Sequence, residues 1–322
     1  MNKITKNKIN QAGRVFRFEN MALSLILVLM IAIFWIEYPQ FLARVNIINI
    51  LLTVSIIGII SVPWSMLSIS GGLDISVGSV MGFSAVVISM LFTNGVNLVL
   101  SVIIGLIASG VIGLINGLLI TKVGINSIIV TLGMLSILRS AAYIIAGGRG
   151  IPIIDDSFRT IGLGRVWIFP IPVVIMAVLF VIGYLVLNYS QFGRNIYVAG
   201  GNEKAAEVSG INIDWIRISL YIVTSMGAGL GGFIVASQFG TTQPKIGTGY
   251  EFAVITAVVL GGISLGGGIG NIIGTLLGVL IIGTLRYGLT ITGIHSFYQT
   301  IGEGLILLIA VTIDQIKLRK TS

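Results

Sequence analysis

The sequence predicts an all-α integral membrane protein, a polytopic helical bundle of about ten transmembrane segments, with eight to ten as the range. Two observations of composition and one of pattern predict it. Hydrophobic residues make up 55% of the 322 residues and charged residues only 9%, whereas a soluble domain carries about a quarter charged residues. The apolar residues gather in runs close to the roughly 20 residues that a helix needs to cross the hydrocarbon core.

Ten apolar segments follow one another along the chain, and we expect each to be a helix. The first resembles a signal peptide because basic residues precede it, but residues 36–39 offer no small-residue cleavage site, so it is interpreted as a retained span. The third and eighth are short, which is typical of half-spans or re-entrant segments. The ten segments are 21–36, 46–68, 76–92, 96–121, 125–146, 167–188, 214–238, 251–263, 267–285 and 298–314.

The basic residues predict that both termini are cytoplasmic. With ten spans, 12 of the 19 lysines and arginines lie inside, six lie outside and Arg139 lies within a span, which follows the positive-inside rule. The net charge of +8 is therefore attributed to orientation, and no nucleic-acid partner is expected because no basic run is interleaved with aromatic residues. The expected organisation is a basic cytoplasmic segment at 1–20, a transmembrane domain at 21–315 and a basic cytoplasmic tail at 316–322. Within the domain, a cytoplasmic loop at 189–214 and an external loop at 147–166 are the longest polar connections.

Small residues recur at four-residue spacing inside several predicted spans. Such rows lie on one helix face and let helix backbones approach closely in lipid. Static packing is the commoner use of these rows, and helices that slide during transport are the alternative. The rows are Gly105, Ser109, Gly113 and Gly117; Gly227 with Gly231; Ala228, Gly232 and Ala236; and Gly262, Gly266, Gly270, Gly274 and Gly278.

Motifs for catalysis and nucleotide binding are missing from the sequence. There is no cysteine and the single histidine is His295, so thiolate sites and histidine clusters are excluded. Residues 227–232 match the dinucleotide pattern G-x-G-x-x-G, but they lie within an apolar span and not between a strand and a helix. No Gly-Lys dipeptide occurs, so the phosphate loop of ATPases is absent. If ATP drives this protein, another subunit must hold it.

Ionisable residues are sparse in the predicted spans, although such residues are the usual marks of ion coupling. Asp74 follows two glycines and precedes an apolar helix, so we expect it to be the N-cap of the third segment. Glu251 opens the eighth segment, where the helix dipole favours an anion. Arg139 and Glu303 lie deeper, and a buried pair between them is our hypothesis; Arg286 is the remaining candidate. The set is too sparse for a proton relay, which argues against a secondary transporter.

The polar connection at 189–214 contains a short predicted helix. Asn202 suits its N-cap, Glu203 its first turn and Gly210 its C′ position, and residues 203–209 give a length of about 10 Å. The residues alone leave open whether this helix docks a partner protein or is a solvated connector. The external loop likewise contacts an extracytoplasmic partner or only connects two spans.

Three stretches resemble the permease subunits of bacterial ATP-binding-cassette (ABC) sugar importers of the ribose type, and the resemblance extends from about residue 46 to residue 320. Ser70–Ser79 is similar to the family signature Gly-Ile/Leu-Asp-Leu-Ser-Val-Gly-Ser. The stretch from Gly193 to Ile211 is similar to the cytoplasmic coupling segment. Residues 243–262 are similar to a late block of ordered polar and glycine positions.

The resemblance implies a non-catalytic subunit that forms the path of a monosaccharide, most closely ribose, in the bacterial cytoplasmic (inner) membrane. It implies a second permease copy, identical or not, an ABC ATPase with two nucleotide-binding modules that holds ATP and Mg²⁺, and a periplasmic or lipid-anchored sugar-binding protein. Other pentoses, galactose-like hexoses and autoinducer-2 are alternative substrates. An ion-coupled secondary sugar transporter is the alternative function, and a membrane enzyme is a third.

The resemblance also suggests roles for three groups of residues. The first couples to the ATPase, the second carries the family signature and caps a helix, and the third packs near the pore. In that order, the groups are Asn202, Glu203, Lys204, Ala205, Ala206, Glu207, Ser209 and Gly210; Gly71, Gly72, Asp74, Ser76 and Gly78; and Gly262, Gly266, Gly270, Gly274 and Gly278.

Overall fold

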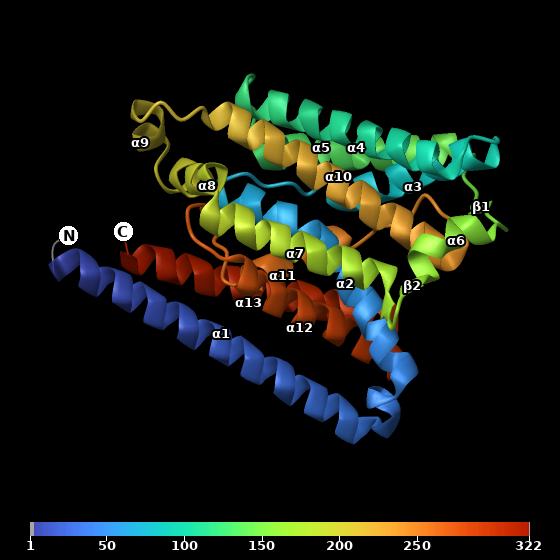
Figure 1. Ribbon diagram of the computed structural model, residues 1–322, viewed down its shortest axis with the longest axis horizontal. Coiled ribbons are helices and arrows are strands. Elements are labelled where there is room, and N and C mark those ends of the chain that lie inside the picture. Colours follow the sequence, from blue (N-terminus) through green and yellow to red (C-terminus); the bar gives the residue numbers. More distant parts are fainter. Residues whose placement is uncertain (1–2, 322) are drawn as a thin grey trace.

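The computed structural model describes residues 3–321, with side chains at 20–295 and 297–316. Within residues 3–321 it contains thirteen α-helices, one 3-10 helix and four strands of two residues each (Figure 1). The predicted all-α membrane fold is therefore confirmed.

Eight helices in the described part of the chain are long and apolar enough to cross a membrane, and two more are apolar but shorter. All ten predicted segments are thus helices, and the predicted short ones, the third and the eighth, are α3 and α11. The long helices are α1 (Lys3–Glu37), α2 (Arg44–Ile69), α4 (Leu98–Thr121), α5 (Ser127–Ile145), α7 (Ile171–Tyr189), α10 (Ile213–Phe239), α12 (Ile272–Ile291) and α13 (Ser296–Thr321), and the shorter ones are α3 (Val77–Thr93) and α11 (Tyr250–Leu260).

The remaining elements gather at the two ends of the bundle (Figure 1). The end that carries α8 and α9, called the α9 end, is also where α1 begins and α13 ends. The opposite end, called the α6 end, carries α6 and the antiparallel pair of β1 and β4. The beginning of α1 and the end of α13 therefore lie on one side, as an even number of crossings requires. That this side is cytoplasmic stays a prediction. These elements are α8 (Gln191–Gly201), α9 (Glu203–Val208), α6 (Asp156–Leu163), β1 (Ile151–Pro152), β4 (Thr241–Thr242), the hairpin of β2 (Arg165–Val166) and β3 (Phe169–Pro170), and the 3-10 helix η1 (Pro39–Leu42).

The core of the protein lies around α2, α3, α10 and α11. Every residue of α2 from Val54 to Ile69 is buried, and α10 packs against α2, α3 and α4. The aromatic side chains of Trp64 and Tyr221 are fully buried in this region. The flanking helix α1, by contrast, exposes large apolar side chains over its membrane-spanning half, as expected for helices that face lipid.

The two short helices begin inside the bundle, and each follows a non-helical segment. The α2–α3 segment (residues 70–76) runs from the α9 end into the core (Figure 1). The α10–α11 segment (residues 240–249) starts at the α6 end and reaches the beginning of α3, where Gly247 lies against Gly78. Gly78 precedes Thr93, the last residue of α3, by 15 residues, so this contact lies about 22 Å along the helix from its outer end.

The structure corrects the predicted row of five glycines from Gly262 to Gly278. The row does not lie on one helix face, because α11 ends at Leu260 and α12 begins at Ile272. Gly262 and Gly270 have φ angles of 86° and 145°, which a right-handed helix excludes. Only Gly274 and Gly278 lie on α12, where they pack against the backbone of Gly261 and Ala257.

The other small residues at four-residue spacing lie in close contacts between helices. On α4, Gly113 packs against the backbone of Tyr221 and Ile222. On α10, Gly232 packs against the backbone of Met81 in α3. These approaches bring α3 and α4 to α10 at backbone distance, which is how small residues associate helices in lipid, and α3 and α4 also pack against each other.

The contact at Gly232 predicts a stability difference between two glycine variants. A Cβ at Gly232 lies 2.7 Å from the carbonyl carbon of Met81, whereas a Cβ at Gly133 of α5 meets nothing within 4 Å. We expect Gly232→Ala to lower the free energy of unfolding by about 1–3 kcal/mol, because overpacking forces a backbone shift. Gly133→Ala, the matched control, is expected to leave it unchanged or raise it. Unfolding in mixed detergent micelles measures both, and equal stability of the two variants would contradict the packing.

Candidate docking and translocation site

The short helix α9 lies at the α9 end, directly after α8. It covers Glu203–Val208 and ends one residue before the predicted boundary. Asn202 is its N-cap, as predicted, because its side-chain oxygen accepts a hydrogen bond of 3.0 Å from the amide of Ala205. Ala206 is buried while Val208 is 91% exposed. The helix is therefore fixed to the bundle by one face and presents the other to its surroundings.

Arg217 of α10 connects α9 to the α2–α3 segment. Its guanidinium forms an ion pair with Glu203 of α9, and its Nε donates a hydrogen bond of 3.0 Å to the carbonyl of Ser70. One turn further along α10, the hydroxyl of Tyr221 donates to the carbonyl of Leu73 at 3.1 Å and accepts from its amide at 3.3 Å. One face of α10 thus holds both the proposed docking helix and the backbone of the signature stretch.

Backbone contacts bring a third stretch, the 261–271 loop between α11 and α12, to the same place. The amide of Gly268 donates a hydrogen bond of 2.8 Å to the carbonyl of Ile69 at the end of α2. Gly200 of α8 lies against both residues, and a Cβ there would stand 2.6 Å from the nitrogen of Gly268, so only glycine fits. The hydroxyl of Tyr197 donates to the carbonyl of Gly270 at 2.9 Å. The signature, the coupling segment and the glycine-rich loop, which are far apart in sequence, therefore meet at the α9 end.

Asp74 is not the N-cap of α3, which corrects our expectation. The helix begins at Val77, and the N-cap residue is Ser76. The Asp74 carboxylate instead accepts hydrogen bonds from the amide of Ser76 at 2.8 Å and from its hydroxyl at 2.6 Å. It closes a turn before the helix, a local bond that aspartate forms readily two residues ahead. The indole of Trp64 donates to the carbonyl of Asp74 at 2.8 Å, so the turn is anchored to α2.

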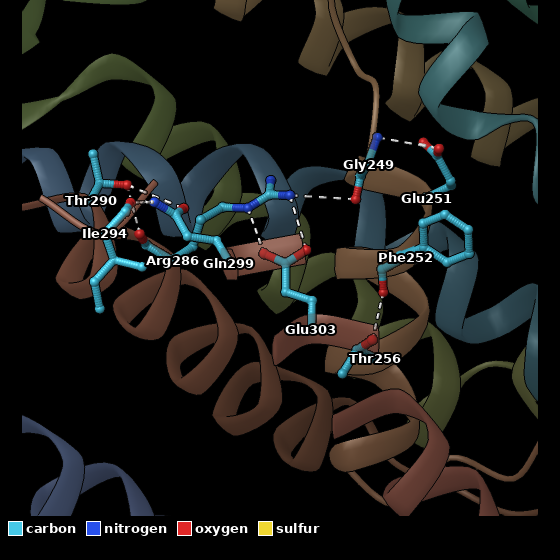
Figure 2. Close-up of polar contacts among 9 residues, drawn as sticks. All are labelled: Gly249, Glu251, Phe252, Thr256, Arg286, Thr290, Ile294, Gln299 and Glu303. Atoms are coloured by element: carbon cyan, nitrogen blue, oxygen red, sulfur yellow. Dashed lines mark hydrogen bonds and ion pairs between the residues drawn. The ribbon is translucent and has the colours of Figure 1, made fainter. Parts of the chain in front are cut away.

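The α10–α11 segment is held by two arginines. Arg139 of α5 donates from Nη1 to the carbonyls of Pro244 and Ile246, both at 2.8 Å. Arg286 of α12 reaches the carbonyl of Gly249 at 3.4 Å (Figure 2). Glu251 lies in the first turn of α11, as expected, and its Oε1 accepts from the amide of Gly249 at 3.2 Å.

Glu303 pairs with Arg286, so the hypothesis of an Arg139–Glu303 pair is wrong. The guanidinium and the carboxylate join through two hydrogen bonds, of 2.8 Å from Nε and 3.1 Å from Nη2 (Figure 2). The same guanidinium lies 4.7 Å from the ring centre of Tyr250. The sequence identifies Arg139 and Glu303 as charges within predicted spans, but it does not show their partners. Glu303 meets Arg286 because α13 packs alongside α11 and α12. The guanidinium of Arg139 binds backbone carbonyls instead.

At the α6 end, α6 is fixed to α10 and exposes its own charged residues. The hydroxyl of Ser237 donates to the carbonyl of Phe158 at 2.6 Å and accepts from the amide of Gly162 at 2.7 Å. Asp155 is the N-cap of α6, and hydrogen bonds from the side chain and amide of Ser157 hold the pKa of its carboxyl below the ordinary value.

Residues 46–311, which run from the start of α2 into α13, match the family model described as branched-chain amino acid transport system / permease component. The chain belongs to this permease family. It is 40% identical over 293 residues to the ribose import permease of Bacillus subtilis, covering 90% of this chain and 91% of that protein. The ribose import permease of Escherichia coli K12 is 37% identical, covering 90% and 92%. The L-arabinose ABC transporter permease of Azospirillum brasilense is 36% identical, covering 95% and 88%.

No solved structure matches this permease at a significant level. The match begins at residue 46, close to Arg44, the first residue of α2, so α1 precedes the part that the family model covers.

A double-mutant cycle tests the buried ion pair. We expect Arg286→Met to lower the free energy of unfolding by about 3 kcal/mol, because it leaves the nine-tenths buried carboxylate of Glu303 without its partner. Glu303→Gln should then lower the free energy of unfolding far less in the Arg286→Met background than in the natural chain. The control cycle uses Arg139→Met and Glu303→Gln, whose effects should add within about 0.5 kcal/mol. Coupling in the control cycle and additivity in the first would contradict the pairing.

Proposed function

We propose that the chain is the membrane-spanning permease subunit of an ABC importer and forms the translocation path of a monosaccharide, ribose, by alternating access. The observation that carries the proposal is the 40% identity to a ribose import permease over nine-tenths of both chains. A similarity this long includes the signature stretch, the coupling segment and the late glycine block together. The protein is then a multi-pass component of the bacterial inner membrane, without a catalytic role of its own.

In this proposal α9 is the element on which a separate ATPase subunit docks. Its exposed face carries charged side chains, and its buried face is joined to the core. The ATPase holds ATP and Mg²⁺. When the ATPase changes conformation, α9 transmits the displacement to the permease. The docking residues are Asn202, Glu203, Lys204, Ala205, Ala206, Glu207, Ser209 and Gly210.

Two connections support α9 as the point where energy enters. Arg217 joins Glu203 to the backbone of Ser70, and Gly200 lies against both Ile69 and Gly268. A displacement of α8 and α9 therefore acts directly on the C-terminal end of α2 and on the 261–271 loop. Helices packed at backbone distance shift as rigid units, because close packing leaves their side chains little room to change rotamer.

The two glycine-containing groups receive structural roles in this proposal. The signature residues shape the α2–α3 segment and the start of α3, and the late glycines form the turn between α11 and α12 and its packing beside the path. The residues are Gly71, Gly72, Asp74, Ser76 and Gly78 for the first group, and Gly262, Gly266, Gly270, Gly274 and Gly278 for the second.

The partners follow from the same proposal. A second permease copy completes the path, and a periplasmic or lipid-anchored binding protein delivers the sugar to the α6 end, where the external loop at 147–166 lies. The organisation is a basic cytoplasmic segment at 1–20, a permease domain at 21–315 with its coupling loop at 189–214, and a basic tail at 316–322.

Reconstitution distinguishes the proposal from an ion-coupled carrier. The permease with its ATPase and binding protein should accumulate ribose in proteoliposomes only when ATP is supplied on the ATPase side. The permease alone should take up no ribose under a proton or sodium gradient, because in this proposal the energy comes from ATP bound by the separate ATPase subunit. Gradient-driven uptake by the isolated permease would overturn the proposal.

Charge reversal on α9 tests the docking role. We expect Lys204→Glu with Glu207→Lys to reduce co-purification of the ATPase about tenfold while membrane insertion is unchanged, since two charges of the exposed face are reversed and the Glu203–Arg217 ion pair that seats the helix is kept. Glu37→Lys is the matched control, because Glu37 ends α1 at the opposite side of the bundle. Full complex formation and transport by the α9 variant would rule out α9 as the docking element.

A further inference from the structure

The α10–α11 segment is non-helical backbone that lies deep in a membrane protein. Gly247 is beside the first turn of α3, about 22 Å from the outer end of that helix. Arg139, which binds the carbonyls of Pro244 and Ile246, stands six residues before the end of α5, or about 9 Å. Non-helical backbone at this depth is tolerated only where it is buried in protein or lines a water-filled cavity.

One side of this segment is not buried by the rest of the described chain. Gln243, Lys245 and Thr248 are exposed, while Pro244 and Gly247 between them are buried. A lysine ammonium in contact with the hydrocarbon core costs about 2.5–3.5 kcal/mol at its centre. The alternation turns every polar side chain of residues 243–248 outward, so the exposed side faces water and not lipid.

A recess of about 460 Å³ lies along this exposed side. This volume is in the range of small-molecule sites, roughly 300–1,000 Å³. Its wall combines two aromatic side chains with an amide, an ammonium and a hydroxyl, and no carboxylate lines it. These residues are Phe239, Tyr250, Gln243, Lys245 and Thr248.

We propose that this recess, called the outer recess, is a wall of the translocation path and contacts the neutral monosaccharide during its passage. Gln243 and Thr248 exchange hydrogen bonds with sugar hydroxyls, and the ring of Tyr250, held by Arg286 at 4.7 Å, offers a flat surface to the C–H face of the sugar. This inference rests on the proposed function and adds the residues that the substrate meets.

The way the segment is held links the outer recess to alternating access. Its carbonyls are bonded to Arg139 on α5 and to Arg286 on α12, and Gly247 touches the start of α3. The recess therefore moves with these helices. A shift that starts at the α9 end and moves α3, which follows the α2–α3 segment, changes the exposure of the recess.

Cysteine accessibility tests the proposal, because the natural chain contains no cysteine. Gln243→Cys and Thr248→Cys are compared with Ile182→Cys on α7, an apolar position 49% exposed. Each variant is reconstituted with its partners and treated with a membrane-impermeant, charged methanethiosulfonate. We expect positions 243 and 248 to react at least tenfold faster than position 182, since the thiolate forms in water and not in lipid. Ribose-loaded binding protein with ATP should slow both reactions several-fold.

Three results would overturn the inference. Reaction at 243 and 248 as slow as at 182 would mean that the segment faces lipid or protein. Rapid oxidative cross-linking of Thr248→Cys between two copies, without labelling, would make this face an interface between copies. Labelling that ribose leaves unchanged would exclude contact with the sugar. ATP-driven ribose uptake by the unaltered complex, measured separately, tests the proposed function, and labelling by the water-soluble reagent does not depend on that result.

Discussion

The structure depends on one constraint, which is that backbone polar groups inside a membrane must find partners within the protein. Long helices meet it by their own hydrogen bonds. The two non-helical segments, 70–76 and 240–249, cannot, and side chains from neighbouring helices bind their carbonyls instead. The side chains are Trp64, Arg217 and Tyr221 for the first segment, and Arg139 and Arg286 for the second.

Three of these bonds come from arginine side chains, whose role here is to hold backbone. Arg139, Arg217 and Arg286 all bind backbone carbonyls, and two of them also hold a carboxylate. A planar guanidinium with five donors suits this double task, which a lysine ammonium does not reproduce. The three arginines therefore hold the two non-helical segments, and this use agrees with a permease whose energy comes from a partner.

The sequence predicted the ten helices, including the two short ones, because apolar length and interruption are local properties. Helix α9 was predictable for the same reason, since Asn202 and Gly210 are local capping signals. The partner of Glu303 and the role of Arg139 were not, because they depend on which helices become neighbours. The prediction for the row from Gly262 to Gly278 was wrong because four-residue spacing looks helical even where Gly262 and Gly270 adopt φ angles that a right-handed helix excludes. That Gly71, Gly200 and Gly268 lie close together could not be predicted from a single sequence, because these residues are far apart along the chain.

Hydrogen–deuterium exchange of the assembled importer tests most directly whether the α9 end transmits movement to the core. Peptides covering 203–208 and 70–76 are compared with and without ATP, in the natural chain and in Arg217→Met. We expect ATP to change exchange in both regions of the natural chain, and in Arg217→Met to change it at 203–208 while the response at 70–76 falls severalfold. A response at 70–76 that Arg217→Met leaves intact, or no response there in the natural chain, would contradict the account.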